Sequence, residues 1–233
     1  MILKRSWAGE VRNISVLVAI GIGTDGYRQI LGVAEGEKED LEGWRGFLRH
    51  LRDRGLKGVR LIISDACRGL VEAAAEVYPK TDWQRCVVHF YRNVFSHVPN
   101  TKVAEVARML KAIHAQEDLK EAQRKAAEIV KRLKELRLKS AAELVEQKVS
   151  ETLTYYAYPS THWRQIRTNN PLERIIREIR RRTRVVGAFP DGQSALMLVA
   201  ARLQHIASTK WGKRRYLVME HLLNPAKQEE AAA

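Results

Sequence analysis

Cysteine is scarce in this chain: Cys67 and Cys86 are its two cysteines in 233 residues. Two cysteines cannot form a disulfide framework, so we expect a protein of the reducing cytoplasm. No apolar run approaches the roughly 18 residues that a membrane span needs. The first residues, Met1–Trp7, lack the apolar core of a signal peptide. The sequence therefore predicts a cytoplasmic protein without a membrane partner.

Acidic residues are also scarce relative to basic residues. Lysine and arginine number 41 against 27 aspartates and glutamates, which gives a formal net charge of +14 and a pI near 10.0. Such a balance favours a polyanionic partner, nucleic acid first and an anionic membrane surface second. The hydrophobic fraction of 45% is enough for a real core, and it excludes global disorder.

Glycine and proline are absent from residues 102–158, which are rich in Ala, Glu, Lys and Leu. This composition predicts a block of helices. Around the block, alternation of strands and helices indicates an α/β fold with a helical insertion. Strands are predicted at 14–22, 27–33, 59–64 and 83–88, with a turn at 23–26, and helices at 39–54, 68–77, 169–182 and 194–209. The predicted segments are a core region of residues 1–100 whose first strand is incomplete, an insertion 101–160, a core completion 161–224 and a flexible tail 225–233.

Asp65 directly follows the predicted strand 59–64. In α/β sheets, ligands bind at the carboxyl ends of strands. A carboxylate there suits Mg²⁺ or Mn²⁺, because these hard ions combine one or two carboxylates with phosphate oxygens. The alternative is that Asp65 caps the helix that follows it, a common role for aspartate. The local sequence leaves both roles open.

Glu173 lies at the start of the predicted helix 169–182. Asn170 is a good N-cap residue and Pro171 suits the first helical position, so Glu173 could close a capping box. The functional alternative is a metal-binding carboxylate on a helix that lies against the sheet. Eight arginines occupy 21 positions around it, more than solubility requires, and arginine forks bind phosphates well. They are Arg164, Arg167, Arg174, Arg177, Arg180, Arg181, Arg182 and Arg184, for which the alternative is a solvated face.

Cys86 and His89 form a Cys-x-x-His pair. Structural zinc needs about four ligands, and the spacing to His97, His162 or Cys67 is not diagnostic. We therefore favour a supporting role for the pair. Trp163, between a histidine and an arginine, is a candidate for stacking on DNA bases, although tryptophan is more often a core residue.

Ordered motifs occupy nearly the whole chain. They are Arg12-Asn13, Val16–Gly21, Asp25–Arg28, Trp44–Leu48, Arg54–Val59, Ile63–Ala66 with Gly69-Leu70, Trp83–Cys86 with Val88-His89, Arg92–Val94, Asn169–Arg174 and Arg180–Pro190. Together they resemble the Mutator-type transposases of bacterial insertion sequences, members of the DDE superfamily.

The resemblance implies a ribonuclease-H-like mixed sheet with helices, and an all-helical insertion before the helix of the catalytic glutamate. It makes Asp65 and Glu173 two carboxylates of an Asp-Asp-Glu site for Mg²⁺ or Mn²⁺, with Cys86 and His89 in support. The implied activity is phosphodiester hydrolysis followed by strand transfer in cut-and-paste DNA transposition. The implied partners are element-end and target DNA and further copies of the chain, in the bacterial nucleoid. The expected DNA-binding residues are Trp163, Arg164, Arg167, Asn169, Asn170, Arg174, Arg177, Arg180, Arg181, Arg182 and Arg184.

The chain departs from the family at its start. The first catalytic aspartate of the family lies just ahead of the stretch that corresponds to residues 3–7, and Asp25 lies at a predicted hairpin tip where it cannot replace it. We therefore expect an N-terminally truncated transposase that lacks the first aspartate and the helical region for element ends. The alternatives are a catalytically inactive DNA-binding remnant and, with less support, an RNA-binding or helical interaction protein.

Overall fold

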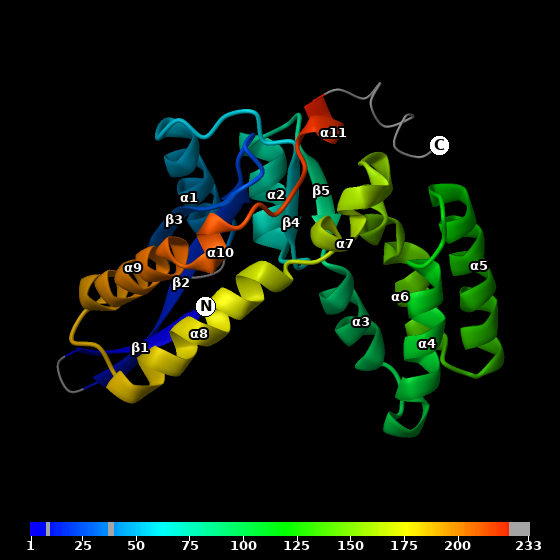
Figure 1. Ribbon diagram of the computed structural model, residues 1–233. Helices are drawn as coiled ribbons and strands as arrows, with labels where there is room; N and C mark the ends of the chain where they lie inside the picture. The colour runs from blue at the N-terminus through cyan, green and yellow to red at the C-terminus, as the bar shows by residue number, and fades with distance from the viewer. Residues whose placement is uncertain (8–9, 37–39, 224–233) are drawn as a thin grey trace. The chain divides into compact units, whose positions relative to one another are not determined.

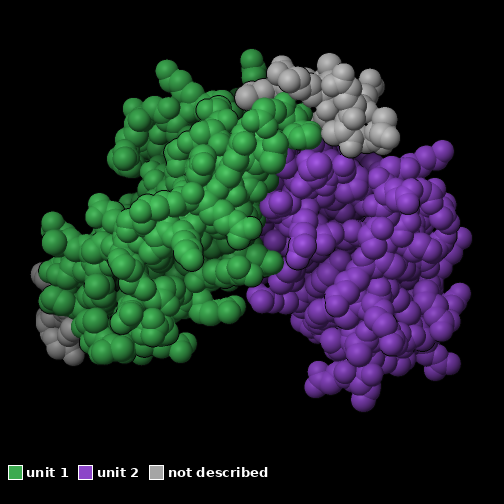
Figure 2. All heavy atoms as spheres, viewed as in Figure 1, with its two compact units in different colours: residues 1–60, 67–81, 169–233 green, residues 61–66, 82–168 purple. Residues whose placement is uncertain are grey.

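The computed structural model describes residues 1–7, 10–36 and 40–223, which form two compact units (Figure 2). Unit 1 comprises residues 1–60, 67–81 and the chain from 169 onward, and unit 2 comprises 61–66 and 82–168. The predicted tail 225–233 lies outside the described residues. The division into four segments that the sequence suggests stays a prediction.

Unit 1 contains a three-stranded antiparallel sheet of order β1-β2-β3. Its strands are β1 (Ile2–Trp7), β2 (Glu10–Ile22) and β3 (Arg28–Gly36). The predicted hairpin of residues 14–33 is confirmed, with strands longer than the apolar run alone suggests. A β-bulge between Ala19 and Ile20 shifts the register against β3. The turn before β3 contains Gly26, whose φ of 80° lies in the left-handed region that glycine adopts readily.

Helices cover both faces of this sheet (Figure 1). On one face, the even-numbered apolar residues of β2 pack against α8 (Asn170–Val186) and α9 (Gly192–Ser208). On the other face, Gly32 of β3 admits Leu51 and Phe47 of α1 (Leu41–Asp53). The core residues on the α8 and α9 side include Leu3, Ile14, Val16, Val18, Ile175, Ile179, Val199 and Leu203. Unit 1 also contains α2 (Arg68–Val77), α10 (Lys210–Lys213) and α11 (Glu220–Leu223).

Unit 2 combines a two-stranded parallel sheet with a helical bundle (Figure 1). The strands are β4 (Leu61–Ser64) and β5 (Asp82–Arg85). The helices are α3 (Val87–Phe95), α4 (Val103–Ile113), α5 (Leu119–Glu135), α6 (Lys139–Lys148) and α7 (Trp163–Ile166). Short 3₁₀ turns occupy Asn100–Lys102, Ser150–Thr152, Thr154–Ala157 and Ser160–His162.

The predicted helical block 102–158 is confirmed up to Lys148, but beyond it the chain forms 3₁₀ turns rather than α-helix. The predicted strand 83–88 is correct only to Arg85. The valines Val87 and Val88 resemble a strand in sequence, yet they begin α3, because Val87 and Phe90 are buried on one helical face. Tertiary burial therefore overrides the strand propensity of the two valines.

The fold is mixed α/β, as predicted. Its strands form two separate sheets in the described chain, and a single ribonuclease-H-like mixed sheet stays a prediction. Among the described residues, no helix is long and apolar enough to cross a membrane.

A buried polar network connects the helices of unit 2. His114 Nε2 lies 2.9 Å from the hydroxyl oxygen of Thr152, and that hydroxyl donates to the carbonyl of Val149. On the other side of the ring, Nδ1 lies 2.8 Å from the Tyr91 hydroxyl oxygen, and that hydroxyl donates to the Leu110 carbonyl at 2.9 Å. Burial favours the neutral imidazole and lowers the pKa of His114 from 6.5 to about 4.

The first prediction concerns the α8 contact with the sheet. Ile179 is 1% exposed in the core of unit 1, so Ile179→Ala should lower the free energy of unfolding by about 2–5 kcal/mol through lost burial and a residual cavity. Val185 on the same helix is 86% exposed, and Val185→Ala should change it by less than about 0.5 kcal/mol. Urea unfolding followed by circular dichroism measures both. Equal effects would show that this face of α8 is not packed.

The second prediction concerns pH. The unfolded chain takes up a proton at His114 as the pH falls below 6.5, whereas the folded chain does so only near pH 4. Stability of unit 2 should therefore decline between these values, by on the order of 2 kcal/mol from pH 7 to pH 5. Urea unfolding at both pH values should show this decline. It should be smaller in His114→Asn, and an equal decline in that variant would assign the effect to other groups.

Candidate functional site

Asp65 and Cys86 follow the carboxyl ends of two adjacent parallel strands in unit 2. Ser64 of β4 pairs with Arg85 of β5, and the Cys86 amide donates to the Ser64 carbonyl at 2.7 Å. The residues after these two strand ends are thus neighbours at one sheet edge. Asp65 is exposed there. His89 is the third residue of α3, which begins directly after Cys86. The structure therefore brings the predicted Asp65, Cys86 and His89 to the same end of this sheet.

Asp65 is not the N-cap residue of α2. That position belongs to Cys67, two residues further along the chain, whose side chain makes no capping hydrogen bond. The stretch after β4 continues as an irregular segment before α2 begins, so Asp65 does not occupy the cap position. Its carboxylate is exposed after the end of β4, and a role as metal ligand stays a prediction.

Gln84 and Arg85 hold this sheet edge in place, a role that the sequence alone did not predict for either residue. Gln84 is fully buried: its amide nitrogen donates to the Thr152 carbonyl at 2.9 Å, and its amide oxygen accepts from the Tyr155 amide at 2.9 Å. Arg85 is buried and forms an ion pair with Glu151, in which Arg85 Nη1 lies 2.9 Å from Glu151 Oε2. The signal was a pair of polar residues inside the predicted strand 83–88, because buried polar groups need partners from other elements.

Trp163 and Arg167 are engaged inside unit 2. The Trp163 indole N–H donates to the Tyr158 carbonyl at 2.7 Å, and its ring meets Tyr156 edge-on at 4.6 Å. Arg167 donates from Nη1 to the His114 carbonyl at 3.0 Å. Trp163 is half-buried by these contacts, whereas Arg164 beside it is exposed. Their predicted contacts with DNA stay predictions, and Arg164 is the most accessible of the three.

The start of α8 differs from the prediction by one residue. Asn169, rather than Asn170, is the N-cap residue, and its side chain makes no capping hydrogen bond. The Glu173 amide donates to the Asn169 carbonyl at 3.1 Å, so Glu173 is the fourth helical residue. A capping box needs the glutamate at the third position. The interpretation of Asn170 as the N-cap residue is therefore wrong, and Glu173 is half-buried at the fourth helical position.

One exposed flank of α8 contains Glu173 and three arginines. Arg177, Arg180 and Arg184 follow Glu173 at intervals of four, three and four residues, a spacing that keeps side chains on one helix face. The three arginines are exposed. Among the residues that the structure describes, no carboxylate lies within ion-pair distance of any of them. This flank, which we call the open arginine flank, carries uncompensated positive charge next to a carboxylate.

The opposite exposed flank of α8 is compensated by Glu178. Glu178 binds Arg181 at 3.0 Å, lies 3.7 Å from Arg182 and also pairs with Arg202 of α9. The hydrogen bonds from Arg181 and Arg202 lower the pKa of Glu178 to about 2. The predicted DNA-binding arginines thus fall into two classes, and those at 181 and 182 already have an anionic partner.

No group of three or more His, Cys, Asp or Glu side chains that could hold a metal ion occurs in the described ranges 1–7, 10–36 and 40–223. A complete protein cage, as structural zinc requires, is therefore absent from the described chain. The donors at hand are single carboxylates, which suit a hard ion that takes its other ligands from water and phosphate.

Comparison with known proteins points to one family. The chain matches the model of the transposase Mutator family over residues 1–213. It is 39% identical to the transposase for insertion sequence element ISRM5 of Rhizobium meliloti over 215 residues, which cover 92% of this chain and 54% of that protein.

Two further relatives agree with this match. The chain is 39% identical over 222 residues to the transposase for IS1081 of Mycobacterium tuberculosis, covering 95% of this chain and 53% of that protein. It is 31% identical over 211 residues to the transposase for IS256 in transposon Tn4001 of Staphylococcus aureus, covering 89% and 54%. The chain thus spans about half the length of the curated relatives it matches. The chain belongs to the Mutator family of transposases.

Proposed function

We propose that this chain is the catalytic core of a DDE-type DNA transposase that hydrolyses a phosphodiester and transfers the strand in cut-and-paste transposition. The observation that carries the proposal is the open arginine flank, where Glu173 shares one helix face with three arginines that have no anionic partner in the described chain. Membership of the Mutator family supports it. A ribonuclease-H-like arrangement of the sheets belongs to the same proposal, as do assembly of several copies and a place on nucleoid DNA.

In this proposal, Asp65 and Glu173 are metal-ligating carboxylates. Each is presented by a regular element, at the end of β4 and in the first turns of α8, and carboxylates are ligands that Mg²⁺ and Mn²⁺ prefer. Such ions activate water or a 3′-hydroxyl and stabilise the leaving oxygen. Cys86 and His89 support the sheet edge from the start of α3. DNA contacts are proposed for the exposed arginines first and for Trp163, Arg167, Asn169 and Asn170 second.

The third prediction tests the open arginine flank. Arg177→Ala with Arg184→Ala should weaken binding to duplex DNA about equally for unrelated sequences, because the lost contacts are to phosphates. The slope of log affinity against log salt should fall by about 2, close to 0.9 for each contact. Fluorescence anisotropy at several salt concentrations measures both quantities.

The matched control is Arg181→Ala with Arg182→Ala, which removes the same charge from the same helix. Because these two arginines already neutralise Glu178, their loss should weaken binding less than the loss of Arg177 and Arg184. Equal losses would mean that only total charge matters. A flat salt response of the unchanged chain would refute DNA binding through phosphates altogether.

The fourth prediction tests the proposed metal ligand at β4. Asp65→Asn should weaken Mn²⁺ binding about tenfold or more, because the amide keeps the shape and removes the charge that the ion needs. Glu117→Gln is the control, since it removes an exposed carboxylate elsewhere in unit 2. Calorimetric titration with Mn²⁺ measures the affinity of both variants. Equal Mn²⁺ affinity in the Asp65→Asn variant and the unchanged chain would contradict the catalytic role of Asp65 and favour a DNA-binding protein without catalysis.

A further inference from the structure

Arg28, the last residue of the motif Asp25–Arg28, lies between two aromatic rings of unit 1. Its guanidinium carbon is 4.8 Å from the ring centre of Trp211 and 4.9 Å from that of Tyr216. Cation–π attraction holds the guanidinium in this position. The rings do not satisfy its N–H donors: Arg28 Nε is buried and has no hydrogen-bond partner among the described residues. A positioned guanidinium with an unused donor is prepared for an anionic ligand.

Hydrogen bonds and core packing fix the residues that surround Arg28. The amides of Tyr216 and Leu217 donate to the Gly26 carbonyl at 2.8 and 3.2 Å. Gly26 has a φ of 80°, and a side chain there would collide with the Leu217 carbonyl oxygen. Trp211 packs against the core between the sheet and α8 and α9. The segment after α10 is therefore fixed against the β2–β3 turn, and the two rings that hold Arg28 are fixed with it.

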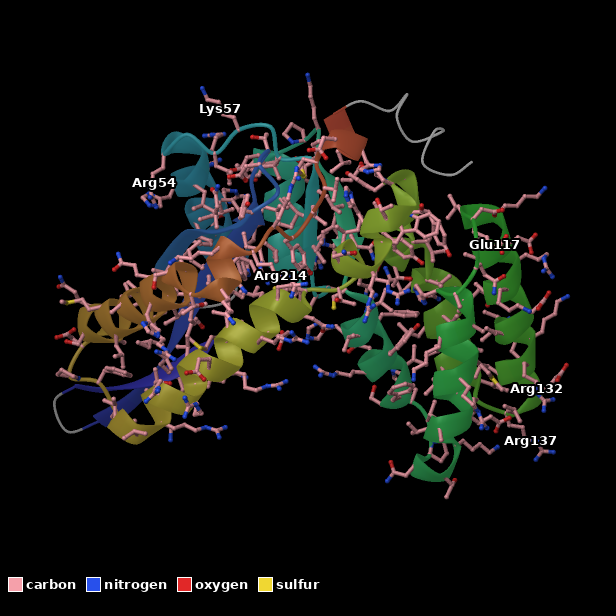
Figure 3. The ribbon with its side chains drawn as sticks, viewed as in Figure 1. Arg54, Lys57, Glu117, Arg132, Arg137 and Arg214 are labelled. Carbon is pink, nitrogen blue, oxygen red and sulfur yellow. The ribbon has the colours of Figure 1, made fainter. Side chains whose placement is uncertain are left out.

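Two further arginines are close to Arg28. Burial lowers the pKa of Arg28, and the charges of Arg214 and Arg174 lower it further, so both lie within electrostatic reach. Arg214 is exposed and directly follows α10 (Figure 3), and Arg174 is in the early turns of α8. Over the residues that the structure describes, none of the three arginines forms an ion pair.

The positive charges of Arg28, Arg174 and Arg214 repel one another. An anion bound between them would remove this repulsion. Arg215, the neighbour of Arg214, forms an ion pair with Glu220 at 2.8 Å. The cluster of Arg28, Arg174 and Arg214 has no such partner in the described chain. The N-terminal end of a 17-residue helix, α8, adds a favourable dipole for an anion.

We propose that Arg28, Arg174 and Arg214 form a binding site for a backbone phosphate of DNA, built on the β2–β3 turn and the segment after α10. The inference rests on the proposed DNA-binding function and adds a second contact point to it, separate from the open arginine flank. Guanidinium groups bind phosphate oxygens in a forked geometry that lysine does not offer. The site carries no sequence information, because phosphate contacts position the duplex without reading bases.

The experiment compares two adjacent exposed arginines. Arg214→Ala should weaken binding of a short DNA duplex about tenfold at constant salt and lower the salt slope by about 1. Arg215→Ala removes the same charge one residue away and should change the affinity less than about twofold. Both side chains are exposed, so both variants should fold, which thermal unfolding checks. Anisotropy measures the affinities.

A second readout follows the site itself. In chain labelled with 5-fluorotryptophan, the ¹⁹F resonance of Trp211, assigned with Trp211→Phe, should shift when DNA is added to the unchanged chain and to Arg215→Ala. In Arg214→Ala the shift should be reduced. Equal DNA affinity of Arg214→Ala and Arg215→Ala, with the unchanged chain still binding, overturns the site and leaves the proposed function intact. Failure of the unchanged chain to bind DNA overturns both.

Discussion

The contact between the apolar stripe of α8 and the sheet of unit 1 determines which side chains of α8 face outward. Ile175 and Ile179 are buried against β1 and β2, and this burial fixes the rotation of the helix about its own axis. Once the rotation is fixed, every other residue of α8 has a defined direction. Glu173 and the open arginine flank face outward on one side, and Glu178 with its arginines lies on the other. Function in this unit therefore depends on a hydrophobic contact.

Helix α8 contains many charged residues, and their distribution decides which arginines are ion-paired and which are available to a ligand. Glu178 neutralises part of the helix and binds Arg202 of α9, so some arginines contribute to the packing of two helices. Those on the open arginine flank and around Arg28 have no such partner in the described chain. The arginines of one helix thus divide between holding the fold together and remaining available to a ligand. In unit 2, the carboxylate of Glu151 has the structural role and pairs with the buried Arg85.

Local patterns explain which regions could be predicted from the sequence. The hairpin, the helices and the exposure of the arginines follow from periodicity and turn residues, and Asp65 at the end of β4 follows from an apolar run that stops at a carboxylate. Other features depend on contacts far apart in the chain. The valines at the start of α3 resemble a strand until the burial of Val87 and Phe90 is known. Gln84 binds backbone groups near residues 152 and 155, and Arg28 meets Trp211 and Tyr216. No local pattern encodes such pairings.

Gly26 has a consequence for how this protein can be modified. Surface turns usually accept inserted peptides, labels and tags, because little depends on their backbone. The β2–β3 turn is different, since the carbonyl of Gly26 receives two amide hydrogen bonds from the segment after α10. An epitope or fluorophore inserted at Thr24–Gly26 would break these two hydrogen bonds and release the segment that contains Tyr216 from the turn. An attachment point at Lys57, after the glycine that follows α1 and exposed (Figure 3), avoids this anchor.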